Sequence, residues 1–230
     1  MGVEVQESGA VDTLCIKGHH NKFTIRNLRH ELLFESGISA LRDGYYREAV
    51  ANFASALERY LEFQIRVLVA YQNPTVNQAE FTKVWKQMSK QSERQVGAFW
   101  MAYFSAFNEA PTPFDKRFLD KRNINLGIEG NDPVHFRNII IHQGSFATYN
   151  QAVSYGEAVS RYIANLVDTG IELAGVGYNN KYLAALIHVA HGAPYDKIGS
   201  RNMPTFLNTS PTQVERVSKQ SLYDIFPLIP

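Results

Sequence analysis

The sequence predicts an all-α protein, organised as a bundle of up-down helices with irregular segments at both ends of the chain. Apolar residues recur at every third or fourth position through most of the middle of the chain, which is the period of an amphipathic helix. No segment shows a convincing strand pattern. We therefore expect an N-terminal tail or short extended segment over residues 1–24, a helical domain over 25–191 and an irregular C-terminal extension over 192–230.

The first predicted helices are defined by their apolar stripes and by the residues that end them. Helix one covers about 28–42 and stops before Gly44, which suits a helix end. Helices over 76–90 and 93–108 come third and fourth, and the apolar circumference of the fourth predicts a central, buried helix. The second helix, over 46–73, has the strongest pattern, with one face formed by Ala49, Phe53, Leu57, Tyr60, Leu61, Ile65 and Leu68.

The second half of the chain continues the helical pattern. Residues 114–130 predict a short helix followed by a loop, and 180–191 predict the last good helix. After Gly192, Pro, Asn, Ser and Thr dominate, so we expect irregular chain with at most one short helix over 211–220. Before these, a long amphipathic helix over 150–175 turns inward Val153, Ala158, Val159, Tyr162, Ile163, Leu166 and Val167.

The composition excludes several classes of protein. The net charge of the 230 residues is +1, so no global field draws the chain to nucleic acid or to a membrane, and any contact with a polyanion must be local. No run approaches the roughly 18 uninterrupted apolar residues of a membrane helix. The single cysteine, Cys15, excludes an intramolecular disulfide framework, and a cytoplasmic location without membrane contact is the expectation.

Two groups of potential metal ligands are present in the sequence. Neither has the four-ligand spacing of a structural zinc site, so we expect no metal and no other cofactor. The groups are Cys15 with His19 and His20, and His188 with His191 and Asp196.

The segment with the clearest chemistry is NDPVHFRNIIIHQGSF, residues 131–146. Asp132 followed by Pro133 is a helix start, because the Asp side chain caps free backbone amides and Pro fits the first helical position. Gly144 marks the stop. Between them we expect a helix of about three turns, in which Asn138 and His142 lie one turn apart on the same face.

The other residues of this helix divide into two sides. Arg137 lies about 140° from His142 on the helical wheel, within reach because its side chain is long. Ile139 and Ile140 occupy the opposite arc, so the helix is predicted to anchor one side and to present a cation, an amide and an imidazole on the other. The alternative is structural: Arg137 pairs with a carboxylate, Asn138 caps a neighbouring group, and His142 favours the helix C-terminus.

The chain resembles the HEPN domains (higher eukaryotes and prokaryotes nucleotide-binding). Their signature is Arg, usually followed by a polar residue, and then His after four intervening positions, which Arg137, Asn138 and His142 match. The helix over 46–73 and the long helix after the motif also look like helices of such domains, so the resemblance covers about 28–170. It implies an all-helical HEPN-like bundle.

The resemblance implies metal-independent cleavage of RNA, in which a ribose 2′-hydroxyl attacks the adjacent phosphate and leaves a 2′,3′-cyclic end. The residue types suit this reaction. A guanidinium such as that of Arg137 stabilises extra charge on phosphate oxygens, and the imidazole of His142 transfers protons near neutral pH. Asn138 can hold a phosphate oxygen or the attacking hydroxyl. We predict these three as the catalytic residues of an endoribonuclease.

One copy of the motif supplies one imidazole, whereas this reaction benefits from an acid and a base together. A two-fold homodimer with its motif helices side by side supplies both, and members of the family generally form such composite sites. Many of them act in stress responses or phage defence, which suggests such a role here. A branch of toxins paired with a nucleotidyltransferase antitoxin carries Tyr two positions after the motif His, where this chain has Gly144, so membership of that branch is not expected.

Glu58 is predicted to support the site. It lies one turn from Glu62 on the second predicted helix, and in the family an acidic residue on this helix often faces the motif Arg. Glu58 is therefore expected to orient Arg137. The alternative is that the two glutamates form a solvated pair flanking Arg59 and Arg66.

The segment FDKRFLDKR concentrates basic residues upstream of the motif, where they can follow an RNA backbone. Asp115 and Asp120 partly neutralise this segment, so an ion-paired surface helix is the alternative. His135 is a further candidate for substrate binding, with an ordinary surface histidine as its alternative. The basic residues predicted to contact RNA are Lys116, Arg117, Lys121 and Arg122.

A rival function is a non-catalytic HEPN-like module that dimerises and binds RNA or a nucleotide. The intact set of Arg137, Asn138 and His142 favours catalysis, because a binding module has no need of the imidazole. A helical scaffold in which these residues are structural is the third interpretation.

Overall fold

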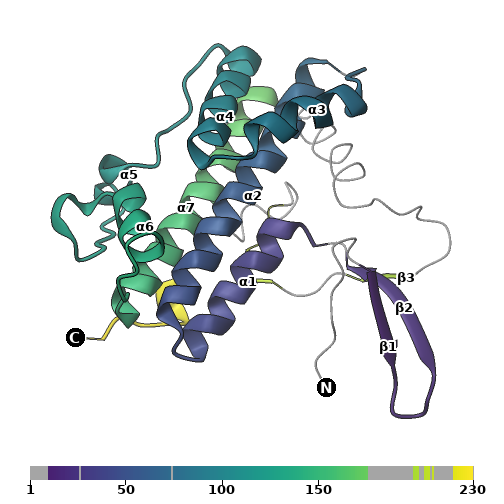
Figure 1. The fold of residues 1–230 in the computed structure, drawn as a ribbon. Helices are drawn as coiled ribbons and strands as arrows, with labels where there is room; N and C mark the ends of the chain where they lie inside the picture. The colour runs from purple at the N-terminus through teal and green to yellow at the C-terminus, as the bar shows by residue number, and fades with distance from the viewer. Residues whose placement is uncertain are drawn as a thin grey trace.

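The structure, a computed structural model, describes residues 10–25, 27–73, 75–175, 199–201, 205–207, 209 and 220–229. Helices account for most of these residues, and a small sheet extends from one side of them (Figure 1). No helix in the described ranges is both long and apolar enough to cross a membrane. The predicted helix over 180–191, and residues 211–219 of the one predicted over 211–220, lie outside the described residues.

The prediction of an all-α chain without strands is wrong near the N-terminus. β1 (Ala10–Leu14) and β2 (His20–Ile25) form an antiparallel hairpin, and β3 (Gly199–Arg201) pairs with β2 in parallel. The pattern missed this sheet because its strands are short and because β3 is remote in sequence from its partner. The mostly helical class of the fold is confirmed.

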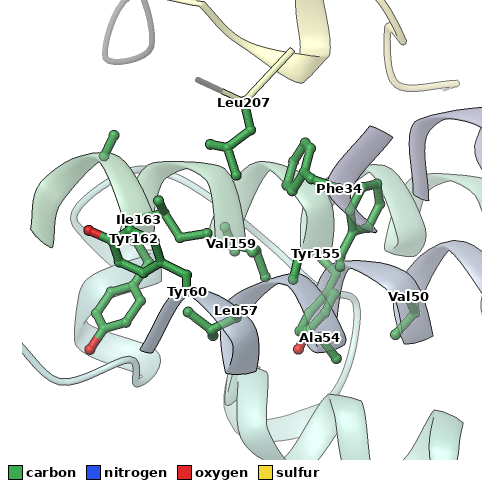
Figure 2. Packing of buried hydrophobic residues seen from close by; sticks show 14 of the residues in the cluster. Phe34, Val50, Ala54, Leu57, Tyr60, Tyr155, Val159, Tyr162, Ile163 and Leu207 are labelled. Carbon is green, nitrogen blue, oxygen red and sulfur yellow. The ribbon is translucent and has the colours of Figure 1, made fainter. Parts of the chain in front are cut away.

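α1 (Arg29–Arg42), α2 (Tyr46–Gln72) and α7 (Tyr149–Ala174) form the centre of the bundle (Figure 1). Their bounds agree with the predicted helices to within one or two residues, and every residue predicted to face inward from α2 and α7 is buried. Figure 2 shows side chains of α2 and α7 meeting in this core, where Leu207 from the C-terminal part of the chain also lies.

Two glycines allow these three helices to approach one another closely. A Cβ at Gly37 of α1 would lie 2.5 Å from the ring of Phe53, and one at Gly156 of α7 would lie 2.7 Å from the same ring. Phe53, on α2, is fully buried between them. The ring therefore fills space that any larger residue at either glycine would occupy.

α4 (Ser92–Phe107) is not the central helix that its apolar sequence predicts. It buries Phe99 and Tyr103 against the core, whereas Met101 is 67% exposed and Phe104 is 50% exposed. α3 (Gln78–Met88) contacts α4 and begins at Asn77, whose side chain accepts hydrogen bonds from two backbone amides. A helix can have apolar residues on most of its surface and still leave some of them exposed to solvent. The apolar composition of α4 was therefore not sufficient to predict a central position.

The segment between α4 and α7 contains three short helices. α5 (Lys116–Asp120) precedes a loop, as predicted, and is followed by the 3₁₀ helix η1 (Glu129–Asn131) and by α6 (Pro133–Ile141). Buried residues along the segment, among them Phe118, Leu119 and Leu126, belong to the same core as α2 and α7. This packing fixes the position of α6.

The end of the chain is bound to the side of α7, around the 3₁₀ helix η3 (Leu222–Asp224). The buried carboxylate of Glu157 accepts hydrogen bonds from the Leu222 backbone N–H at 2.7 Å and from the Ser221 hydroxyl at 3.0 Å. The side chain of Asn150 exchanges two hydrogen bonds with the backbone of Ile229. Within the described residues, the predicted irregular extension thus includes a segment that packs on the helical core.

Candidate active site

α6 begins where the sequence predicts it, but it ends at Ile141, so that His142 is the C-cap residue and does not lie within the helix. The Asp132 carboxylate caps the helix by accepting a hydrogen bond from the His135 backbone N–H at 2.7 Å, and Pro133 occupies the first turn. After Ile141, the C-cap residue His142 leads to Gly144, which has a φ of 74°. This positive φ favours glycine and turns the chain away from the helix axis.

The buried side of α6 differs in part from the predicted one. Pro133, Phe136 and Ile140 are buried, with the Phe136 ring 5.4 Å from that of Tyr155 on α7. Ile139, predicted to anchor the helix together with Ile140, is only partly buried, although it packs against the core. Residues 133, 136 and 140 are spaced three and four apart, so they lie on one face of the helix. That face is the one that packs against the core.

The three motif residues meet through the guanidinium of Arg137. Its Nη1 donates a hydrogen bond to Oδ1 of Asn138 at 3.1 Å and lies 3.3 Å from Nε2 of His142. When the imidazole is neutral, Nε2 accepts this hydrogen bond and the ring proton is on Nδ1. The long side chain of Arg137 thus bridges the angular separation expected from the helical wheel.

Glu58 of α2 holds the other side of the guanidinium. Its Oε1 lies 2.7 Å from Nη2 of Arg137, in an ion pair whose side chains are 29% and 18% exposed. Glu62, one turn further along α2, is paired instead with Arg59 at 2.6 Å and with Arg66 at 3.3 Å. Glu58 therefore contacts Arg137 of the motif, as predicted for an orienting residue. Glu62 instead pairs with Arg59 and Arg66 of its own helix, as the alternative interpretation described.

The exposure of the cluster increases from Arg137 to His142. Arg137 and Asn138 are half-buried, and His142 is exposed at the end of the helix. A partly buried guanidinium with one bound carboxylate is restricted in its motion, whereas the imidazole beyond it is open to a ligand. An anion can therefore bind between the guanidinium of Arg137, which is held in place, and the solvent-accessible imidazole of His142.

A pocket of about 390 Å³ adjoins this cluster and was not predicted from the sequence. Glu58 and Arg137 form part of its lining, and the rest is mainly apolar and aromatic, with contributions from α2, α4, α6, α7 and the residues before α5. The lining residues away from the motif include Leu57, Leu61, Glu93, Val96, Phe99, Trp100, Phe114, Val134, Tyr155 and Tyr162.

Tyr155 belongs to this lining and is affected by the charges of the motif cluster. It is 2% exposed, and burial raises the pKa of its hydroxyl well above the usual value, while the charge of Arg137 lowers that pKa and the charge of Glu58 raises it. Both charges therefore act on the hydroxyl. Tyr155 was not singled out from the sequence, and its spacing of four residues from Val159 is the one local signal that could have placed it on the buried face.

The predicted RNA-binding residues are mostly engaged in local contacts. Lys116 pairs with Asp120 at 3.1 Å, and Arg117 pairs with Asp115 at 2.8 Å. Arg122 donates a hydrogen bond to Oδ1 of Asn165 at 2.9 Å, and its guanidinium lies 3.7 Å from the Phe118 ring centre. These contacts agree with the alternative interpretation of this segment as an ion-paired surface helix.

The other two predicted contacts remain on the surface. Lys121 is exposed, as is His135, which lies one turn before Asn138 on α6. Neither lines the pocket beside Arg137. The structure therefore brings together Arg137, Asn138, His142 and Glu58, and leaves the two surface residues outside the cluster.

The described residues contain no group of three or more His, Cys, Asp or Glu side chains arranged to hold a metal ion. His20 lies 3.8 Å from Asp12 in an exposed pair. His188, His191 and Asp196, which form the second potential ligand group, lie outside the described residues.

Comparisons of this chain with protein-family models, with characterised proteins and with solved structures find no match. Its function is therefore inferred from the geometry and chemistry of the site.

Proposed function

We propose that this protein is a metal-independent endoribonuclease of the HEPN type, which cleaves RNA by attack of a ribose 2′-hydroxyl on the adjacent phosphate. The observation that carries the proposal is the position of the Arg137 guanidinium, held by Glu58 on one side and 3.3 Å from the His142 imidazole on the other. A phosphate oxygen bound at this point has both a cation and a proton carrier within reach.

In the proposed reaction the 2′-oxygen forms a bond to phosphorus while the bond from phosphorus to the 5′-oxygen breaks. The proton of the 2′-hydroxyl passes to a neutral imidazole, and an imidazolium donates a proton to the departing 5′-oxygen. Arg137 stabilises the negative charge that develops on the phosphate oxygens. Asn138, 3.1 Å from Arg137, orients the guanidinium and can donate its amide N–H groups to the phosphate.

The second imidazole is proposed to come from another copy of the chain in a two-fold dimer. Apolar residues are exposed in the motif helix and just after it, since Val134 of α6 is 51% exposed and Phe146 is 89% exposed. A symmetric contact over this helix would cover them and would bring two copies of His142 together. Both catalytic protons could then be handled in one composite site.

The pocket beside the ion pair favours a second candidate function. Its lining is concave and mainly apolar, which suits binding of a ligand and requires no proton carrier. A non-catalytic module that dimerises and binds RNA or a nucleotide would use the same residues without proton transfer. The two candidates differ in the part they assign to His142.

Cleavage assays separate these candidates. Purified protein is incubated with total RNA and with tRNA in the presence of a chelator, and the fragment ends are analysed for 2′,3′-cyclic phosphate. We expect His142→Ala and Arg137→Ala each to lower the cleavage rate by about 100-fold or more, because each removes a group that acts in the transition state. His19→Ala is the control, an exposed histidine in the turn between β1 and β2, and should cleave at the wild-type rate.

The result that would overturn the proposal is equal cleavage by wild type and both variants, which would mark the activity as a contaminant. Cleavage that requires a divalent cation would exclude the mechanism. Cyclic ends that depend on His142 and persist in chelator would exclude the non-catalytic module.

A further inference from the structure

The pocket beside Arg137 contains a polar group that the proposed reaction does not use. The Tyr155 hydroxyl has no hydrogen bond within the described part of the chain, and it is not one of the fully buried side-chain atoms that lack a partner there, although the residue as a whole is 2% exposed. Tyr162, which lines the same pocket, donates from its hydroxyl to the Thr112 carbonyl at 2.9 Å. The Tyr155 hydroxyl therefore keeps access to the pocket, where it can form a hydrogen bond with a ligand atom or a water.

The Tyr155 hydroxyl points from α7 toward Ala54 of α2 (Figure 2), and both residues line the pocket. Arg137 and Glu58 belong to the same lining, and their charges both act on this hydroxyl. The lining of the pocket therefore includes a phenolic hydroxyl together with the guanidinium that is proposed to contact the phosphate.

The lining of the pocket includes aromatic side chains that can stack on a flat ring. Trp100 of α4 and Phe114 are partly exposed, whereas Phe99 and Tyr162 are buried, and the ring centres of Phe114 and Tyr162 are 4.7 Å apart. Aromatic side chains of this kind bind nucleobases by stacking. The volume of about 390 Å³ is at the lower end of the range for small-ligand pockets, roughly 300–1,000 Å³, and is sufficient for one heterocycle.

The charges at the pocket favour a ring that donates hydrogen bonds. Glu58 and Glu93 are its two acidic lining residues, and Glu93 is exposed. Carboxylates accept from the exocyclic amino groups of adenine, cytosine or guanine, whereas uracil presents two carbonyl oxygens beside its single ring N–H. Tyr155 can accept from, or donate to, the opposite edge of the ring.

We infer that this pocket binds one unpaired, amino-bearing nucleobase of the RNA, beside the phosphate that Arg137 contacts. The assignment of the base to RNA rests on the proposed ribonuclease function, whereas the recognition of the base depends only on the pocket. A free nucleotide has the same base chemistry and is distinguished by experiment. Selection of the base next to the scissile phosphate would give the cleavage reaction a sequence preference.

Calorimetric titration of the full chain tests the inference. The probes are adenosine 5′-monophosphate, uridine 5′-monophosphate, and trinucleotides of adenine or uracil built on 2′-deoxyribose, which lack the attacking hydroxyl. We expect the adenine trinucleotide to bind more tightly than the uracil trinucleotide by threefold or more, and more tightly than either monophosphate, in line with about 1 kcal/mol for a net hydrogen bond.

Two variants examine the pocket itself. Tyr155→Phe removes only the hydroxyl and should weaken binding of the adenine trinucleotide by about threefold to tenfold. Tyr45→Phe is its matched control, a 63% exposed tyrosine that is not part of the lining, and should bind as wild type does. Val96→Trp places a large ring at a lining position that is 42% exposed and should abolish binding without opening the core.

The inference is overturned if the wild type binds none of the four probes, if uracil is bound as tightly as adenine, or if Val96→Trp binds as the wild type does. Equal affinity for the adenine monophosphate and trinucleotide would overturn the assignment to RNA in favour of a free nucleotide. Cleavage that depends on His142 without base binding would refute the pocket and leave the ribonuclease proposal intact. Base binding without cleavage of any RNA would refute the ribonuclease proposal and leave the pocket intact.

Discussion

Arg137 and His142 lie five residues apart, and the guanidinium Nη1 of the first is 3.3 Å from the imidazole Nε2 of the second. The contact is possible because α6 ends between them, so that His142 occupies the C-cap position and Arg137 can extend along the last turn. A cation fixed beside an accessible imidazole is the chemical basis of the proposed function.

The ion pair between Glu58 and Arg137 should matter for cleavage. Glu58→Gln keeps the size of the side chain and removes its charge, so we expect a less well-positioned guanidinium and about a tenfold lower cleavage rate. Glu62→Gln, one turn along α2 and paired with Arg59 and Arg66, is the matched control and should retain the wild-type rate. An equal rate for wild type and Glu58→Gln would show that Glu58 does not position Arg137 for catalysis.

If the active site is the proposed composite of two protomers, an inactive protomer is dominant. Wild-type protein that exchanges subunits with an excess of His142→Ala should then lose activity faster than dilution predicts, because each mixed dimer would have only one imidazole. Cleavage rates are measured over a series of mixing ratios, with His19→Ala, at an exposed position outside the site, mixed in the same proportions as the control. Activity that follows the amount of wild-type chain alone would mean that each protomer acts independently.

A single methyl group added between α1 and α2 should lower the stability of the protein, because the two helices pack closely at Gly37. Gly37→Ala puts a Cβ within 2.5 Å of the Phe53 ring, and we expect a loss of about 1–3 kcal/mol in the free energy of unfolding. Gly97→Ala in α4 has no atom within 4 Å of the new Cβ and should stabilise the protein by up to about 1 kcal/mol through helix propensity. Urea denaturation measures both, and a neutral Gly37→Ala would mean that Phe53 moves easily.

The docking of the C-terminal segment should depend on Glu157. Glu157→Gln removes the charge that receives hydrogen bonds from Ser221, Leu222 and Arg161, and we expect about 1–3 kcal/mol of destabilisation. Limited proteolysis should then cut faster within residues 220–229, which the wild type protects by packing them on α7. Glu172→Gln, an exposed position on the same helix, is the control and should leave both measurements unchanged.

His30 should make stability depend on pH. The residue is buried beside Tyr60 and Phe63, its Nε2 lies 2.8 Å from the Thr209 hydroxyl, and burial lowers its pKa to about 3. Because the unfolded chain binds a proton at His30 below about pH 6.5 and the folded chain does not, this residue destabilises the fold as the pH falls from about 6.5 toward 3.

His30→Gln isolates this effect from that of Glu31, whose pKa is raised, chiefly by burial, and which acts in the opposite direction. The unfolding free energy of the wild type, relative to His30→Gln, should fall by about 2 kcal/mol between pH 7 and pH 5. Urea titrations at the two pH values measure it. A constant difference would show that His30 titrates normally in the folded protein.

Elements defined by short-range periodicity were predicted well. The bounds of α1, α2 and α7 and the start of α6 follow from stripes, caps and glycines that lie within a few residues of one another. Long-range arrangements were not predictable in this way. The parallel pairing of β3 with β2, and the partial exposure of α4, depend on what each segment meets in the folded chain.

The candidate site likewise has a part that short-range sequence patterns predict and a part that depends on long-range packing. The sequence by itself determined that Arg137, Asn138 and His142 lie within reach of one another, because they occur at close spacing within and just after one short helix. Only the tertiary structure decided that Glu58, 79 residues earlier, pairs with Arg137. It alone also decided that Tyr155 faces a pocket there, since both relationships arise where helices distant in sequence pack together.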